Sequence, residues 1–225
     1  VVGCNNARTP HDYTHNYVVQ ELIKNDVLVV QTGCSAISVA KLGLLGPEAL
    51  EKAGPGLREV CEAIGIPPVL HLGSCVDNTR ILTVASQMAT EGGLGEDIAD
   101  LPAVGLAPEW MSEKALSIGT YFVASGVYVI FGTKNPVSGS EEVVRLISEG
   151  WEAKVGGKLE FILDAEEMVA KTLEHIDKKR AELGLPEYDA NRFGQSGDVP
   201  LEPFFAVPPE ERNLYSRKAY VEAAD

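Results

Sequence analysis

Three of the four cysteines occupy equivalent places in the chain, each shortly after a glycine that closes an apolar run. Cys4 follows Val1–Gly3, Cys34 follows Val29–Gly33 and Cys75 follows Val69–Ser74. Thiolates are ligands for soft metals, so converging cysteines would suit zinc, copper(I), iron–sulfur units or nickel with sulfide. Their wide spacing differs from the paired C-x-x-C knuckles of zinc ribbons, and spacing alone does not choose the metal.

Other roles for these cysteines remain open at the level of sequence. Free cysteine is among the most buried residue types, so each thiol could simply pack in the core. The repeated strand–glycine–cysteine pattern favours a shared site over that interpretation. Cys61 lies inside a helical stretch without this pattern, and we interpret it as core packing. Disulfides are disfavoured because nothing in the sequence indicates a secreted protein.

Short β-branched runs alternate with longer segments of helical period. We predict strands at Val1–Val2, Val27–Val30, Val69–Leu72, Ala103–Ala107, Val127–Phe131 and Leu159–Leu163. We predict helices at His15–Lys24, Ser35–Leu44, Gly56–Ile64, Asn78–Thr90, Ser112–Ser125, Glu141–Gly150 and Ala165–Leu183. The alternation predicts a Rossmann-like α/β fold: a doubly wound, mostly parallel sheet with helices on both faces.

This fold explains how distant cysteines could meet. The carboxyl ends of parallel strands share one edge of a sheet, and ligands of open α/β sheets bind in the crevice beyond that edge. Cys4, Cys34 and Cys75 would all stand there, at the mouths of the helices that follow. A helix N-terminus also favours thiolate over thiol.

Composition and net charge limit the kinds of protein and of partner that fit this sequence. The 225 residues are 45% hydrophobic and 23% charged, which is typical of a globular protein. A net charge of −14 disfavours nucleic acid and anionic lipid as partners. No apolar run reaches the roughly 20 residues of a membrane span, and no signal peptide opens the chain, so we expect a cytoplasmic location. Because Val1 begins inside an expected strand, we interpret the chain as part of a longer protein.

We expect two parts along the chain. Residues 1–188 carry the strand–helix alternation and would form a Rossmann-like domain that holds the three cysteines of the expected site. Residues 189–225 contain several prolines and no clear periodicity, which predicts an irregular C-terminal tail.

Four segments resemble one enzyme family in the same order, namely Gly3–Asn6, Thr32–Ala36, His71–Asn78 and Ala107–Ala115. They are similar to the C-terminal part of the catalytic subunit of the anaerobic nickel–iron–sulfur carbon monoxide dehydrogenases. The resemblance runs from Val1 to about Arg180 and covers about the last third of that subunit. The segment between Cys34 and Cys75 is shorter than in many members, near Ile64–Pro67.

The resemblance implies an active-site cluster of the C-cluster type, with nickel, four irons and sulfides held by five cysteines and one histidine. Cys4, Cys34 and Cys75 match the last three of those cysteines. The other ligands, and additional 4Fe-4S clusters, would belong to the upstream part of the subunit. The isolated chain would therefore be inactive.

The family oxidises carbon monoxide with water to carbon dioxide, two protons and two electrons. Lys114 matches the lysine that hydrogen-bonds the carboxylate formed during this reaction, where a fixed cation stabilises growing negative charge. Ile118 matches an apolar residue that walls the open coordination site. Without the resemblance, Lys114 would be a solvated surface residue and Ile118 a core residue.

Implied partners are the remainder of the catalytic subunit, a second copy in a homodimer, a ferredoxin-like electron carrier and, in some members, acetyl-CoA synthase. Two other functions stay open. One is a cluster-free structural or assembly module of the same fold. The other is a nucleotide-binding α/β domain, although no G-x-G-x-x-G follows a strand and no P-loop motif occurs.

Overall fold

The computed structural model describes residues 1–4, 12–109 and 112–188 of the chain. Six short strands alternate with helices along it. The strands are β1 (Val2–Gly3), β2 (Val29–Gly33), β3 (Val69–His71), β4 (Val104–Ala107), β5 (Tyr128–Phe131) and β6 (Leu159–Phe161).

The α-helices are α1 (Tyr13–Lys24), α2 (Ser35–Lys41), α3 (Pro55–Ile64), α4 (Asn78–Glu91), α5 (Glu113–Ala124), α6 (Glu141–Arg145), α7 (Trp151–Val155) and α8 (Ala165–Glu182). Between α6 and α7 lies a π-helical turn, η5 (Leu146–Gly150). Three 3₁₀ turns, η2 (Pro47–Lys52), η3 (Cys75–Asp77) and η4 (Ile98–Asp100), complete the described elements.

The strands form two parallel sheets in the orders β1-β2-β3 and β4-β5-β6. Strand β1 contacts β4, so the two sheets adjoin in the row β3-β2-β1-β4-β5-β6. The direction of winding reverses between β1 and β4, which is where open α/β sheets place their ligands. The structure therefore confirms the expected mostly parallel α/β fold.

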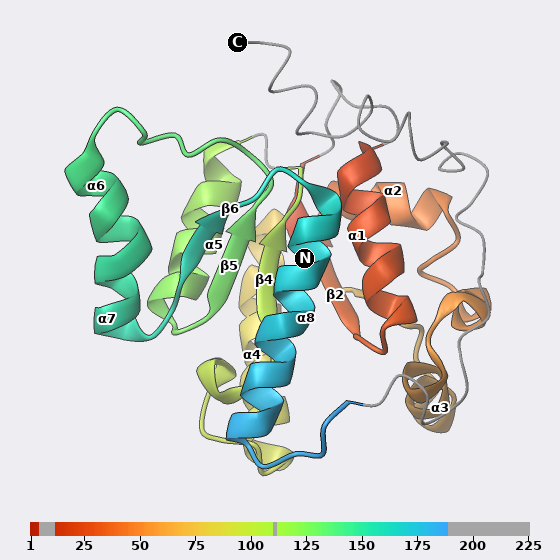
Figure 1. Cartoon of the computed structure of the whole chain (residues 1–225). Coiled ribbons are helices and arrows are strands. Elements are labelled where there is room, and N and C mark those ends of the chain that lie inside the picture. Colours follow the sequence, from red (N-terminus) through yellow and green to blue (C-terminus); the bar gives the residue numbers. More distant parts are fainter. Residues whose placement is uncertain (5–11, 110–111, 189–225) are drawn as a thin grey trace.

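Helices cover both faces of this row (Figure 1). One apolar core packs α1, α2, α3 and α8 against the first sheet and the inner strands of the second. The other core joins α4, α5 and α7 to the opposite face, around the stacked rings of Phe131 and Phe161. Both faces of β5 are buried, which explains why its sequence is a continuous apolar run rather than an alternating one.

Most helix predictions match the structure to within three residues, but the helix expected at Glu141–Gly150 includes the π-helical turn η5 and continues through α7 to Val155. Strand β2 also differs. We expected it at Val27–Val30, but the strand runs from Val29 to Gly33 because its neighbours pair with it only there. The predicted tail, residues 189–225, lies outside the described residues, as do Asn5 and Asn6. Within the described residues, no helix has the length and apolarity that crossing a bilayer requires.

Candidate functional site

Three glycines stand side by side where the first sheet ends. Gly3 of β1 is the register partner of Gly33 of β2, and the Gly33 amide donates a 3.0 Å hydrogen bond to the Gly73 carbonyl. Cys4 and Cys34 follow the first two glycines directly, and Cys75 comes two residues after the third. The cysteines therefore leave the sheet at the same edge.

The glycine at position 33 permits a close approach to Cys75. A Cβ atom at Gly33 would lie 2.9 Å from the Cys75 Sγ and 3.1 Å from the Gly3 carbonyl oxygen. The φ angle of Gly33 is +90°, which L side chains rarely adopt. Both features require glycine at position 33. The absence of a side chain there lets the Cys75 thiol lie against the end of β2.

A buried asparagine fixes the turn that carries Cys75. Asn78 Oδ1 accepts a 2.7 Å hydrogen bond from Thr32 Oγ1, and Asn78 Nδ2 donates to the Cys75 carbonyl. Asn78 is 8% exposed and Thr32 is fully buried. The side chain of Asn78 therefore ties the turn η3 to β2 and sets where the thiol of Cys75 stands.

The same turn is closed by a capping box. Asp77 Oδ2 accepts from the Ser74 amide at 2.8 Å and from the Ser74 hydroxyl at 2.9 Å. These hydrogen bonds lower the pKa of the partly exposed Asp77 carboxyl. Ser74 thus caps the turn η3 with Asp77 as its capping-box partner, whereas Asn78 bridges two elements.

Cys4 connects the first sheet to helix α5 of the second half. Its thiol donates a 3.3 Å hydrogen bond to the Ser112 hydroxyl. Ser112 is the N-cap residue of α5, yet its side chain makes no cap hydrogen bond. Lys114 lies two residues further along, exposed in the first turn, and Ile118 lies one turn beyond it, partly buried against the second core.

The four cysteines divide by exposure. Cys34 is exposed, Cys4 and Cys75 are partly exposed, and Cys61 is fully buried. All four are free thiols. Burial raises the pKa of the Cys61 thiol, as expected for a cysteine that serves as a core residue. The three edge cysteines remain within reach of a ligand.

Within the described residues, no three His, Cys, Asp or Glu side chains gather closely enough to hold one metal ion. A metal cluster is larger than a single ion, and its ligands can stand further apart because each cysteine binds a different metal atom of the cluster. Thiol donors on a shared, accessible sheet edge suit a cluster, and the soft sulfur ligands favour iron–sulfur or nickel chemistry. The residues present therefore fit such a group.

A buried polar layer lies under this edge. A 2.9 Å hydrogen bond joins Gln31 Nε2 to His15 Nε2, and both residues are inaccessible to solvent. Burial lowers the pKa of His15 to about 3, which keeps the ring neutral. Glu109, also fully buried, accepts a 3.1 Å hydrogen bond from the Thr14 amide. The layer connects helix α1 to the carboxyl ends of β2 and β4.

Several of these residues carried no clear signal in the sequence. Ser112 has the pattern of an ordinary helix cap, and Asn78 that of a turn residue. His71 is exposed, because it is the last residue of the edge strand β3. Each of these roles depends on strand order, which local patterns do not contain.

Comparison with known proteins identifies the family. Residues 1–166 match the Prismane/CO dehydrogenase family. The chain belongs to this family. "Carbon monoxide dehydrogenase 1" of Methanosarcina mazei is 56% identical over 185 residues, which cover 82% of this chain and 29% of that protein. The chain therefore spans less than a third of the length of the curated relatives that it matches.

Two further matches support the family and the fold. The "Carbon monoxide dehydrogenase/acetyl-CoA synthase subunit beta" of Moorella thermoacetica is 39% identical over 202 residues, with coverage of 86% of this chain and 30% of that protein. A nickel-free crystal structure of carbon monoxide dehydrogenase from Thermococcus sp. AM4 superposes with a TM-score of 0.77 at 51% identity. It covers 82% of this chain and 29% of the Thermococcus chain.

Proposed function

We propose that this chain is the C-terminal, cluster-binding part of a nickel-dependent carbon monoxide dehydrogenase. The complete enzyme would oxidise carbon monoxide with water to carbon dioxide, two protons and two electrons, in a reversible reaction. The observation that carries this proposal is the row of Gly3, Gly33 and Gly73 at one sheet edge, from which three accessible cysteines emerge.

Cys4, Cys34 and Cys75 would hold the nickel–iron–sulfur cluster as thiolates. The cluster, when bound, supplies the redox chemistry and the site at which carbon monoxide binds. Because only part of its ligand set lies in this chain, the isolated chain would have no activity. Additional 4Fe-4S clusters would belong to the part of the catalytic subunit that this chain does not contain.

The surrounding residues would hold these thiolates in place. Ser112 can turn its hydroxyl proton toward Cys4 once that thiol has lost its own proton. Gly33 leaves room for the Cys75 sulfur, and Asn78 fixes the turn behind it. Hydrogen bonds of this kind orient metal ligands and tune their basicity.

Lys114 would stabilise negative charge on the substrate oxygens. It stands in the first turn of α5, two residues after the Ser112 that contacts Cys4, so its ammonium is tethered close to the cluster-binding edge. A cation fixed in this way lowers the barrier of a step in which anionic charge grows. Ile118, one turn further, would form an apolar wall that admits only small molecules.

The proposed partners follow from the whole enzyme. They are the remainder of the catalytic subunit, a second copy in a homodimer and a ferredoxin-like electron carrier. The name of the Moorella relative supports acetyl-CoA synthase as a further partner. The net charge of −14 supports neither nucleic acid nor anionic membranes as partners.

A pair of cysteine variants tests the cluster assignment in the full-length enzyme, prepared anaerobically. Cys34→Ala should abolish nickel and iron incorporation together with carbon monoxide-dependent reduction of a viologen dye. Cys61→Ala, which changes a buried thiol of the core, should keep both. A Cys34→Ala enzyme with full metal content would remove the ligand assignment, and a metal-free wild type would favour a structural module instead.

A second pair tests Lys114. Lys114→Ala should leave metal content unchanged and slow turnover by about 10²-fold or more, because it removes a charge that acts on the substrate. Lys154→Ala, an exposed lysine of α7, should change neither quantity. Metal loss in Lys114→Ala would assign the lysine a structural role.

A further inference from the structure

A polar cavity of about 350 Å³ lies at the amino-terminal ends of β5 and β6. Helix α8 lines one side of it, and α7 with the turn that precedes β6 lines the other. Figure 1 shows α7 and the last turns of α8 at this end of the two strands. The lining consists of lysine and glutamate side chains around the rings of Tyr128 and His175. The candidate cysteines instead follow the carboxyl ends of the first sheet, so the cavity is a separate feature of the domain.

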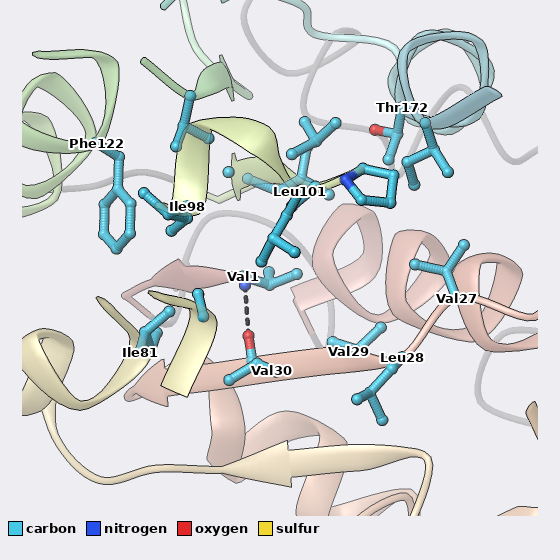
Figure 2. Close-up of a pocket in the computed structure, with 18 of the residues that line it drawn as sticks. Val1, Val27, Leu28, Val29, Val30, Ile81, Ile98, Leu101, Phe122 and Thr172 are labelled. Carbon is cyan, nitrogen blue, oxygen red and sulfur yellow. Dashed lines mark hydrogen bonds between the residues drawn. The ribbon is translucent and has the colours of Figure 1, made fainter. Parts of the chain in front are cut away.

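This lining differs from that of the apolar cavity between β2 and β4. Figure 2 shows that cavity, where Val29, Ile98, Leu101 and Phe122 are among the lining residues. Their side chains are buried in the hydrophobic interior of the domain. Ligand sites use a few convergent polar groups to hold a ligand in one orientation, and the cavity at β5 and β6 supplies such groups. It is therefore the better candidate for a charged ligand.

Lysines gather around this polar cavity although the chain is acidic. The net charge is −14, yet four of the eleven lysines line the cavity, namely Lys158, Lys171, Lys178 and Lys179. Lys158 belongs to the turn before β6. The other three lie on α8 at spacings of seven and eight residues, which places them on one face of the helix. Cations concentrated in a concave place are typical of an anion-binding site.

Two of these lysines are neutralised one to one. Lys158 forms an ion pair with Glu160, and its ammonium lies 5.3 Å from the centre of the Tyr128 ring. Lys171 pairs with Glu174 at 2.8 Å, and both of these side chains are exposed. Neither pair therefore leaves a net charge for a ligand.

The other two lysines share one carboxylate. Glu182 Oε1 lies 3.9 Å from Lys178 Nζ, and Glu182 Oε2 lies 3.7 Å from Lys179 Nζ. Both distances exceed that of a hydrogen bond. The Lys179 ammonium donates to the Ala99 carbonyl at 2.9 Å, which holds it in place. Since the negative end of the α8 dipole is worth only about half a charge, the two ammonium groups exceed the negative charge beside them.

The environment of His175 is positive for the same reason. Its ring packs against Tyr128, with the ring centroids 4.9 Å apart. Burial lowers the pKa of His175, and three ammonium groups lower it further against a single carboxylate, that of Glu182. The three groups belong to Lys179, Lys178 and Lys158. A neutral imidazole keeps one N–H, so His175 adds a donor to the ammonium groups.

We propose that this cavity binds a small phosphate monoester that also carries an ammonium group. Phosphate offers several acceptor oxygens, which suits two lysines and a histidine N–H on adjacent turns of α8. Glu152 lines the α7 side of the cavity and would accept a hydrogen bond from the ammonium group of the ligand. A volume of about 350 Å³ is at the small end of the range for ligand sites, which suits a small molecule. This proposal does not depend on the redox function.

Calorimetric titration of the 225-residue chain with ethyl phosphate tests the phosphate end of the site. We expect saturable binding to one site, with a Kd that rises about tenfold or more in Lys178→Ala because a charge-assisted hydrogen bond is lost. The Lys178 side chain is exposed, so this variant should fold. Lys154→Ala removes an exposed lysine of α7 outside the cavity and should keep the wild-type Kd. Equal weakening in the two variants, or binding that does not saturate, would overturn the site.

A titration with 2-aminoethyl phosphate tests the opposite end of the cavity. This ester differs from ethyl phosphate by its ammonium group, and an exposed ion pair with Glu152 should lower its Kd by about three- to fivefold. Glu152→Gln should remove the difference between the two esters. Equal Kd values for both esters in the wild-type chain would overturn the role of Glu152 and of the ammonium group.

Nuclear magnetic resonance of the histidine rings gives a readout that needs no variant. A phosphate beside His175 favours the protonated ring, so saturation with ethyl phosphate should raise the pKa of His175. The ring resonances of His71, which is exposed at the end of β3, should not move. An unchanged pKa of His175, or equal movement of both rings, would overturn the proposal.

Discussion

The thiol of Cys4 lies 3.3 Å from the hydroxyl of Ser112, across 108 residues of sequence. This contact connects the end of β1 to the start of α5, and thus joins the cysteine edge to the helix that carries Lys114. It also crosses the point where the winding of the sheet reverses. A candidate metal ligand and a candidate substrate-binding lysine are therefore held on one framework.

Replacement of this hydroxyl should weaken the proposed site without unfolding it. In the full-length enzyme, Ser112→Ala removes a hydrogen bond to Cys4, and loss of such a partner lowers metal affinity or activity by about 10- to 100-fold. Helix α5 should persist, because the Ser112 side chain makes no cap hydrogen bond. Ser117→Ala, exposed on the same helix, is the control for metal content and viologen reduction. Equal behaviour of the two variants would contradict the role of Ser112.

A methyl group at Gly33 should be more harmful than one at another glycine of similar φ. Gly33→Ala would place a Cβ 2.9 Å from the Cys75 sulfur and impose φ +90° on alanine. Gly43 also has positive φ, +71°, but a methyl group there would find nothing within 4 Å. Both variants should lose about 1–2 kcal/mol of unfolding free energy, because alanine disfavours a positive φ angle. Steric crowding should add a loss of about 1–3 kcal/mol at position 33 alone.

Urea unfolding of the two alanine variants and the wild type measures this difference directly. The excess loss at Gly33 should be accompanied by altered alkylation of Cys75, whereas Gly43→Ala should leave that thiol unchanged. Equal losses of stability would show that the sulfur is not held against β2.

The alternation of apolar runs with helical segments was sufficient to predict the fold, and the repeated glycine–cysteine pattern was sufficient to predict the shared edge, because both patterns are local in sequence. Strand, glycine and cysteine follow one another within a few residues, and parallel strands end together. The contact between Cys4 and Ser112 could not be predicted in this way, since it depends on β1 being next to β4. The position of β2 also differed, because pairing partners rather than the β-branched residues Val27 and Val29 decide where a ladder begins.

The role of Asn78 also depends on strand order and could not be predicted from local sequence. It leads to a further prediction. Asn78→Ala would leave the buried hydroxyl of Thr32 without its partner and free the Cys75 carbonyl, at a cost of about 1–3 kcal/mol in unfolding free energy. The looser turn should make Cys75 react faster with iodoacetamide, measured by mass spectrometry, while Cys34 keeps its rate. Asn25→Ala, which removes a hydrogen bond at the end of α1, is the control. An unchanged Cys75 rate would show that Asn78 does not position this thiol.

Buried His15 should make the fold sensitive to acid. Its pKa is about 3 in the folded chain and about 6.5 when unfolded, so the unfolded state binds the proton first as pH falls. Its contribution to stability is complete above pH 6.5 and decreases toward pH 3, by about 2 kcal/mol between pH 7 and pH 5. His15→Gln removes this titration and should flatten the dependence of unfolding free energy on pH. His71→Gln, at an exposed histidine, should keep the wild-type slope, and a His15→Gln curve parallel to the wild type would show that the ring takes up its proton while folded.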